Sequence, residues 1–215
     1  MQWPTLIVDN FFTDPQAIVK LSKTLKYKRA IDNKWPGTRS PSLHEVDKEF
    51  FLWSTRKIMS ILYPMDRDVI KWEALQYFQR VPYKIYGEEG WVHNDSGQEF
   101  TSIIYLSDHF QSGTCLYEGT HFNTAVEYEE EKRRFFRDLT DRKRMKKYRD
   151  KSNSKFHKKV ELFSNFNRLV LFDSHNWHAS RNSGGDKNDR LTLITFFSNI
   201  RCENICYPIP TMRRI

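Results

Sequence analysis

Apolar residues recur at helical spacing in two segments near the start of the chain. The first runs over residues 15–26, where Thr13 or Asp14 can cap a helix with a proline at its first position. The second runs over residues 45–63, and a loop rich in Gly, Pro and Ser at 32–42 separates the two. The apolar stripes are Ile18, Leu21 and Leu25 in the first segment and Phe51, Ile58 and Leu62 in the second. The pattern predicts two amphipathic helices.

Beyond residue 69 the apolar residues come in short runs rich in β-branched and aromatic side chains, with turn residues between them. The runs are VIKWEALQYFQRV, EFTSIIYLS, TCLYEG, NRLVLFDS and LTLITFFSNI. Such strands favour a jelly-roll-like core, in a fold that is mainly β with flanking helices (α+β). We expect one domain over 1–215, with helical support at 1–69, a core at 70–126 and 160–206, and a charged helical insertion at 127–159.

Composition narrows the class of protein. The chain has 215 residues, of which 15% are aromatic, and this favours a packed globular domain over disorder. No apolar run approaches the roughly 20 residues of a membrane span, and the first residues do not resemble a signal peptide, so no membrane association is expected. Cys115, Cys202 and Cys206 are too few for a disulfide framework. We expect free thiols and a cytoplasmic protein.

The positive charge is confined to one segment. Residues 129–159 hold 14 Lys and Arg against 6 Asp and Glu, which equals the entire formal net charge of +8. Such a segment can form a patch that contacts phosphates or an acidic partner. A solvated, charge-rich helix explains the same pattern and is the favoured interpretation.

A candidate metal site comes from two distant motifs. His93 and Asp95 stand two apart in GWVHNDSG, so on a strand their side chains would point the same way. His175 or His178 follows the apolar run NRLVLF and can supply a second imidazole. Two imidazoles and one carboxylate form the facial triad of a non-haem Fe(II) site, which leaves three positions open. A hydrogen-bonded His–Asp pair on a strand explains the first motif equally well.

A candidate anion receptor opens the last apolar run. Arg190 begins this strand and Thr192 follows two residues later, so both side chains face the same way. An arginine that enters a β core is costly unless it meets an anion, and a guanidinium beside a hydroxyl suits a carboxylate. The alternative is a surface arginine that keeps its charge in water.

Residues from about 70 to 200 resemble the Fe(II)- and 2-oxoglutarate-dependent dioxygenases, closest to the prolyl-hydroxylase-like branch. The motifs that carry the resemblance are His93-Asn94-Asp95, FDSHNWH ending in His178, and Arg190 with Thr192. SGTCLY is similar to a Gly-Gly-x-Leu segment of this family, with Ser112 in place of the first Gly. Tyr105 and Tyr83 are similar to tyrosines that line the co-substrate pocket, and IVDNFFTDP is similar to openings of viral and bacterial members.

The resemblance implies a double-stranded β-helix core and an enzyme. It implies Fe(II) held by His93, Asp95 and His178, with His178 preferred to His175. It implies 2-oxoglutarate on the iron, its far carboxylate on Arg190, and a pocket that includes Thr192, Tyr105 and Tyr83. The reaction would consume O₂, hydroxylate a C–H bond and release succinate and CO₂, and ascorbate is allowed as a further cofactor.

Two single residues bear on the reaction and the substrate. Halogenating relatives replace the carboxylate ligand by a small residue, so Asp95 favours hydroxylation. Nucleic-acid demethylases of the superfamily carry a second arginine where this chain has Phe196, which disfavours nucleic acid. A peptidyl (prolyl-type) or small-molecule substrate fits better, and the loop at 35–39 could close over the mouth of the site. The competing function is a jelly-roll binding module that contacts nucleic acid or an acidic partner through residues 129–159.

Overall fold

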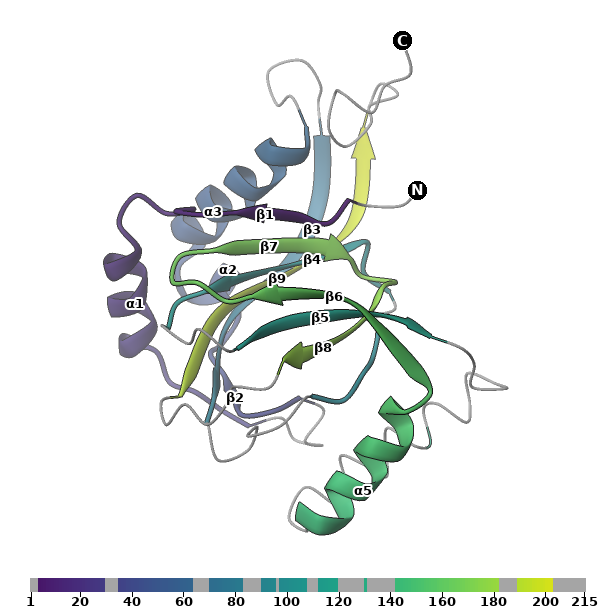
Figure 1. The fold of residues 1–215 in the computed structure, drawn as a ribbon. Coiled ribbons are helices and arrows are strands. Elements are labelled where there is room, and N and C mark those ends of the chain that lie inside the picture. The colour runs from purple at the N-terminus through teal and green to yellow at the C-terminus, as the bar shows by residue number, and fades with distance from the viewer. Residues whose placement is uncertain are drawn as a thin grey trace.

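The strands form two antiparallel sheets that pack face to face (Figure 1). The computed structural model describes residues 4–29, 35–63, 70–82, 90–95, 97–107, 112–119, 130, 142–181 and 189–202. The larger sheet has the strand order β1-β7-β4-β9-β3-β2, and the smaller sheet has the order β6-β5-β8. The strands are β1 Leu6–Val8, β2 Thr38–Arg39, β3 Ile70–Val81, β4 Phe100–Tyr105, β5 Gly113–Gly119, β6 Phe156–Phe163, β7 Leu169–Asp173, β8 Trp177–Arg181 and β9 Arg190–Cys202. The predicted fold class, a mainly β jelly roll with flanking helices, is confirmed.

Strand β9 lies inside the larger sheet, between β3 and β4, and buries side chains on both of its faces. Leu193 and Phe197 pack in the cluster that includes Ile58 of the helical layer. Ile194 points the other way and packs with Leu116 of the smaller sheet. Successive side chains of a strand alternate between faces, so the apolar run LTLITFFSNI is continuous because helices cover one face and the second sheet covers the other.

The helical layer covers one face of the larger sheet (Figure 1). Helix α1 begins as predicted, because the side chain of Asp14 accepts a hydrogen bond from the Ala17 amide at 3.0 Å. The single helix predicted over 45–63 is instead divided into two. The side chain of Asp47 accepts from the Phe50 amide at 3.0 Å, and this cap starts a new helix. The helices are α1 Pro15–Thr24, α2 Leu43–Val46 and α3 Lys48–Leu62.

The described part of the basic segment contains a helix, α5 Arg142–Asn153, which projects away from the sheets (Figure 1). Strand β6 begins soon afterwards, at Phe156, inside the range 127–159 that the sequence assigned to the insertion. Its buried residues Phe156 and Leu162 attach it to the core, and it pairs with β5 along its length. The last residues of that range therefore belong to the smaller sheet.

Two further expectations can be compared with the structure. Cys115 is buried and is not in a disulfide, but Cys202 is joined in a disulfide, so the expectation of a free thiol is wrong at Cys202. Sequence spacing alone does not reveal whether two thiols face each other at bonding distance. Cys206 lies outside the described residues. Within the ranges that the structure describes, no helix is both long enough and apolar enough to cross a membrane.

Candidate metal centre

His93 and His178 are brought side by side by a short backbone pairing. The amide of His93 donates to the carbonyl of His178 at 2.9 Å, and the amide of His178 donates to the carbonyl of His93 at 2.7 Å. His178 lies within β8, and His93 forms a single bridge to it. The two imidazole centroids are 4.4 Å apart. The side chains therefore meet because two segments far apart in the chain pair at this point.

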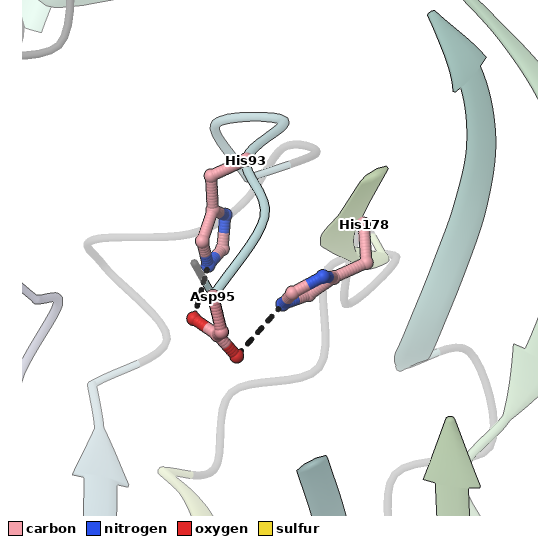
Figure 2. A group of neighbouring side chains, drawn as sticks. All are labelled: His93, Asp95 and His178. Atoms are coloured by element: carbon pink, nitrogen blue, oxygen red, sulfur yellow. Dashed lines mark ion pairs between the residues drawn. The ribbon is translucent and has the colours of Figure 1, made fainter. Parts of the chain in front are cut away.

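Asp95 completes the cluster (Figure 2). Its amide donates to the carbonyl of Ser174 at 2.9 Å, which holds the segment after His93 against the end of β7. One carboxylate oxygen lies 3.8 Å from Nε2 of His93 and the other 3.4 Å from Nε2 of His178. The ligand atoms of all three residues lie within 4.8 Å of one another. Two atoms that each bind one ion at about 2.1 Å can be at most about 4.2 Å apart, so both measured pairs suit a shared ion.

Backbone carbonyls set the orientation of both imidazoles. Nδ1 of His93 lies 2.9 Å from the carbonyl of Trp91, and Nδ1 of His178 lies 2.9 Å from the carbonyl of Asn176. A carbonyl can only accept, so each Nδ1 carries the proton, and in a neutral ring Nε2 then keeps a lone pair. Both Nε2 atoms face the carboxylate of Asp95. Three electron-pair donors that converge in this way can hold a metal ion, and the two carbonyls would then support the imidazoles from outside.

Hydrogen bonds from the sheet hold Asp95 as a carboxylate. The Thr101 hydroxyl donates to Oδ2 of Asp95 at 2.9 Å, and it lies 2.8 Å from the hydroxyl of Ser174. Burial pushes the pKa of Asp95 upward; when each imidazole also carries a proton on Nε2, attraction to His178 and His93 and the hydrogen bonds from His178 and Thr101 outweigh burial. The net result is a pKa well below the usual range. Thr101 and Ser174 were not among the predicted site residues, because a single Thr or Ser on a strand gives no pattern to detect.

His175, the alternative distal ligand, lies outside this cluster. Its Nδ1 is 2.9 Å from Oδ1 of Asp173, and its side chain is 67% exposed. The side chain of His178 is only 7% exposed. His178 is therefore the histidine that the structure brings to His93 and Asp95.

The predicted co-substrate residues gather on the face of the larger sheet that meets the smaller sheet. Thr192 and Tyr105 are directly opposite each other on β9 and β4, and both are buried. The guanidinium carbon of Arg190 lies 5.3 Å from the ring centroid of Tyr105. The Tyr105 hydroxyl is 2.7 Å from that of Thr114, and burial raises the tyrosine pKa despite the nearby Arg190. Tyr83 lies outside the described residues.

A second guanidinium, which the sequence did not predict, lies near Asp95. Arg39 belongs to the loop predicted at 35–39, part of which pairs with β3 as strand β2. Its Nε donates to the side chain of Gln79 at 3.1 Å. Burial lowers the pKa of Arg39 to about 10, although attraction to Asp95 opposes this shift. Arg39 reaches this position only because of the strand register in the sheet. The hydrophobic pattern of the sequence therefore gives no indication that Arg39 belongs to the site.

Residues 1–197 match the Family of unknown function (DUF6445), and the chain belongs to this family. No curated protein matches the chain in sequence.

Solved structures share the fold at low sequence identity. HygX from Streptomyces hygroscopicus, solved with nickel and 2-oxoglutarate, is 12% identical with a TM-score of 0.56, over 90% of this chain and 82% of HygX. The non-haem epimerase SnoN of nogalamycin biosynthesis is 11% identical with a TM-score of 0.57, over 91% of this chain and 78% of SnoN. A 2OG-Fe(II) oxygenase family oxidoreductase from Burkholderia pseudomallei is 12% identical with a TM-score of 0.51, over 90% and 84% of the two chains. These similarities establish the fold.

Proposed function

We propose that this protein is an Fe(II)- and 2-oxoglutarate-dependent dioxygenase that hydroxylates a C–H bond of its substrate and releases succinate and CO₂. The observation that carries the proposal is the convergence of His93, Asp95 and His178, with both Nε2 atoms directed at the carboxylate. Neutral imidazole and carboxylate on one face are the donor set of non-haem Fe(II) oxygenases.

In this proposal each group of site residues has a separate role. His93, Asp95 and His178 would hold the metal, and the carbonyls of Trp91 and Asn176 would keep both imidazoles in the binding tautomer. When bound, Fe(II) and 2-oxoglutarate supply the activation of O₂ that couples decarboxylation to substrate oxidation, and ascorbate would maintain the reduced metal.

Arg190, Thr192 and Tyr105 would bind the far carboxylate of 2-oxoglutarate, and Tyr83 is proposed from the sequence alone. Support comes from the contact of Arg190 with Tyr105 and from the position of Thr192 directly opposite Tyr105. A guanidinium with an adjacent hydroxyl recognises a carboxylate by charge-assisted hydrogen bonds. The low exposure of Thr192 and Tyr105 would keep water from competing for these bonds.

For the primary substrate we favour a small molecule over a peptidyl proline. Structures of HygX and SnoN with the same fold contain hygromycin B and nogalamycin RO, respectively, and both ligands are small molecules. SnoN is an epimerase, so the fold accommodates more than one outcome. We propose hydroxylation because the carboxylate ligand position is filled by Asp95, and a product heavier by one oxygen atom would establish it.

The decisive experiment uses the weak visible band of the Fe(II)–2-oxoglutarate chelate. Fe(II) and 2-oxoglutarate are added to the full chain without oxygen, and the band is expected to appear. It should vanish in His178→Ala and persist in His175→Ala, which removes an exposed imidazole from the turn before β8. Succinate release against a panel of small molecules and peptides then identifies the substrate class. Absence of the band in the folded wild type would refute the proposal.

The second candidate function is binding of nucleic acid or an acidic partner through residues 129–159. The observation in its favour is that α5 exposes Lys143, Lys146, Lys147 and Lys151 to solvent. Phosphate neutralisation makes affinity fall steeply with salt. A titration of DNA or RNA at increasing salt tests it, and absence of binding at low salt would exclude the nucleic-acid version.

A further inference from the structure

The side chain of Arg39 extends along the sheet toward the metal centre. In the larger sheet Arg39 is opposite Gln79, and Gln79 is opposite Thr192. From that row the guanidinium reaches over Tyr77 and then Phe196, with its carbon 5.7 Å and 5.5 Å from the two ring centroids. Because Phe196 is four residues beyond Thr192 on β9, this direction leads away from Arg190.

Phe196 connects Arg39 to the metal ligands. It is directly opposite Thr101 on β4, and Thr101 donates the hydrogen bond to Asp95. Opposite residues of antiparallel strands are about 5 Å apart, so the guanidinium lies on the order of 10 Å from the carboxylate of Asp95. The guanidinium of Arg190 lies over Tyr105, which is opposite Thr192, so four residue steps of β9, roughly 13 Å along an extended strand, separate that position from Phe196. The two arginines are therefore at opposite ends of the site.

Arg39 is held in place but has donors to spare. Its side chain makes one hydrogen bond among the described residues, from Nε to Gln79, and it forms no ion pair with any of them. The Gln79 amide in turn donates to the carbonyl of Pro36 at 2.8 Å, which anchors the loop. The ring of Trp35 lies under the guanidinium at 4.5 Å, and its buried Nε1 has no hydrogen-bond partner in the described part of the chain. A partly buried cation in an aromatic cage, with unused donors, suits an oxyanion.

We propose that Arg39 binds a carboxylate or phosphate group of the primary substrate, at the side of the metal centre remote from Arg190. This inference rests on the proposed function and narrows its substrate to an anionic molecule. Strand β2 is the last strand of the larger sheet, and the backbone of Arg39 exchanges two hydrogen bonds with Lys28 on its outer side, so the guanidinium and not the strand edge is available to a substrate. Trp35 and Phe196 supply flat apolar walls beside the anion.

The test measures anion binding at a loaded site without turnover. The full chain is loaded with Mn(II) and 2-oxoglutarate, and phenyl phosphate and benzoate are the probes, with benzyl alcohol as the neutral match. Calorimetry gives the affinity, and broadening of the probe nuclei by Mn(II) reports whether the probe lies near the metal. We expect both anions to bind and broaden and the alcohol to do neither.

Substitutions assign the binding to Arg39. Arg39→Met should weaken anion binding about tenfold or more, the loss expected for a charge-assisted hydrogen bond, while 2-oxoglutarate affinity stays within about twofold. Arg39→Lys, which keeps the charge and protects the test against a folding defect, should retain part of the affinity. The matched control is Arg80→Met on the neighbouring strand, because Arg80 also lies over an aromatic ring, Tyr27, at 4.1 Å. Its strand partner Leu191 packs with the helical layer, so this control should bind as the wild type does.

Three outcomes would overturn the inference, and a fourth would refute the proposed function. Equal anion affinity in wild type and Arg39→Met would overturn the inference, as would Arg39-dependent binding without broadening in a chain that holds Mn(II). Loss of 2-oxoglutarate binding in Arg39→Met would also overturn it, because Arg39 would then serve the co-substrate. Failure of the wild type to bind Mn(II) and 2-oxoglutarate, measured directly by electron paramagnetic resonance and calorimetry, would instead refute the proposed function.

Discussion

The side chain of Asn153 is hydrogen-bonded to the backbone of Val92, one residue before the metal-site histidine His93. The Val92 amide donates to Oδ1 of Asn153 at 3.0 Å, and Nδ2 of Asn153 donates to the carbonyl of Gly90 at 2.8 Å. Asn153 is the last residue of α5. The end of the basic helix is therefore attached directly to the segment that positions His93.

We predict that Asn153→Ala lowers the metal affinity of the site. Without both hydrogen bonds the segment leading to His93 loses its support, and outer-shell losses of this kind lower metal affinity about 10-fold to 100-fold. Titration with Co(II), followed by its visible absorption, measures the change. Ser154→Ala is the matched control, because the Ser154 hydroxyl donates only to the Lys151 carbonyl within the same exposed turn. If Asn153→Ala binds Co(II) as tightly as the wild type, the hydrogen bonds of Asn153 do not contribute to metal affinity.

Thr101→Val should weaken metal binding with little effect on folding. Valine has nearly the shape of threonine but cannot donate to Asp95, so the carboxylate loses a bond that holds it toward the imidazoles. We expect Co(II) affinity to fall about tenfold. Thr101→Ser keeps the hydroxyl and should stay close to wild type. The same loss in both variants would mean that the hydrogen bond from Thr101 is not the cause of the lower metal affinity.

Arg190→Met should raise the 2-oxoglutarate concentration needed for half-maximal chelate absorbance by about tenfold or more, since a charge-assisted carboxylate contact is lost. Arg190→Lys keeps the charge but lacks the planar guanidinium. Its half-maximal 2-oxoglutarate concentration should lie between those of the wild type and Arg190→Met. Metal affinity measured without 2-oxoglutarate should not change. An unaltered titration midpoint in Arg190→Met would remove Arg190 from the co-substrate site.

Asn167→Ala should be strongly destabilising although it lies away from the metal centre. The Asn167 side chain pairs with the backbone of Phe12 twice, at 2.8 Å each, and its φ of 64° is in the left-handed region. Leaving two buried backbone groups without partners, with alanine strained at this φ, should cost about 3 kcal/mol of unfolding free energy. Urea unfolding measures it. Asn167→Gly relieves the backbone strain and should recover about 1 kcal/mol; equal stabilities would contradict the strain component.

Asp9→Asn should reduce stability in a pH-dependent way. Hydrogen bonds from Arg168, at 2.6 Å and 2.9 Å, lower the pKa of Asp9 in the folded state. A lowered carboxyl pKa stabilises the fold above the unfolded-state value of about 4, and this contribution is lost as pH falls through the folded value. The difference in urea midpoint between wild type and Asp9→Asn should thus be constant above about pH 5 and shrink below about pH 4. A difference that grows in acid would rule out this origin.

Local sequence patterns account for the helices and strands and for the kinds of side chain available for chemistry. Strand alternation and helical spacing are short-range properties, so the runs that became β3, β4, β7 and β9 and the cap at Asp14 were predictable from neighbouring residues. The spacing of His93 and Asp95, with a histidine after NRLVLF, likewise indicated a ligand set from residue types alone.

Which of these residues come into contact depends on how the sheets pack. The choice of His178 over His175 depends on the backbone pairing of His178 with His93, and no local pattern encodes it. The contacts of Thr101 with Asp95 and of Arg39 with Phe196 join strands whose relative register is set by packing of the whole sheet. A shift of one residue in any strand would turn these side chains to the other face. The composition of the site is therefore a property of the sequence, and its geometry is a property of the assembled sheets.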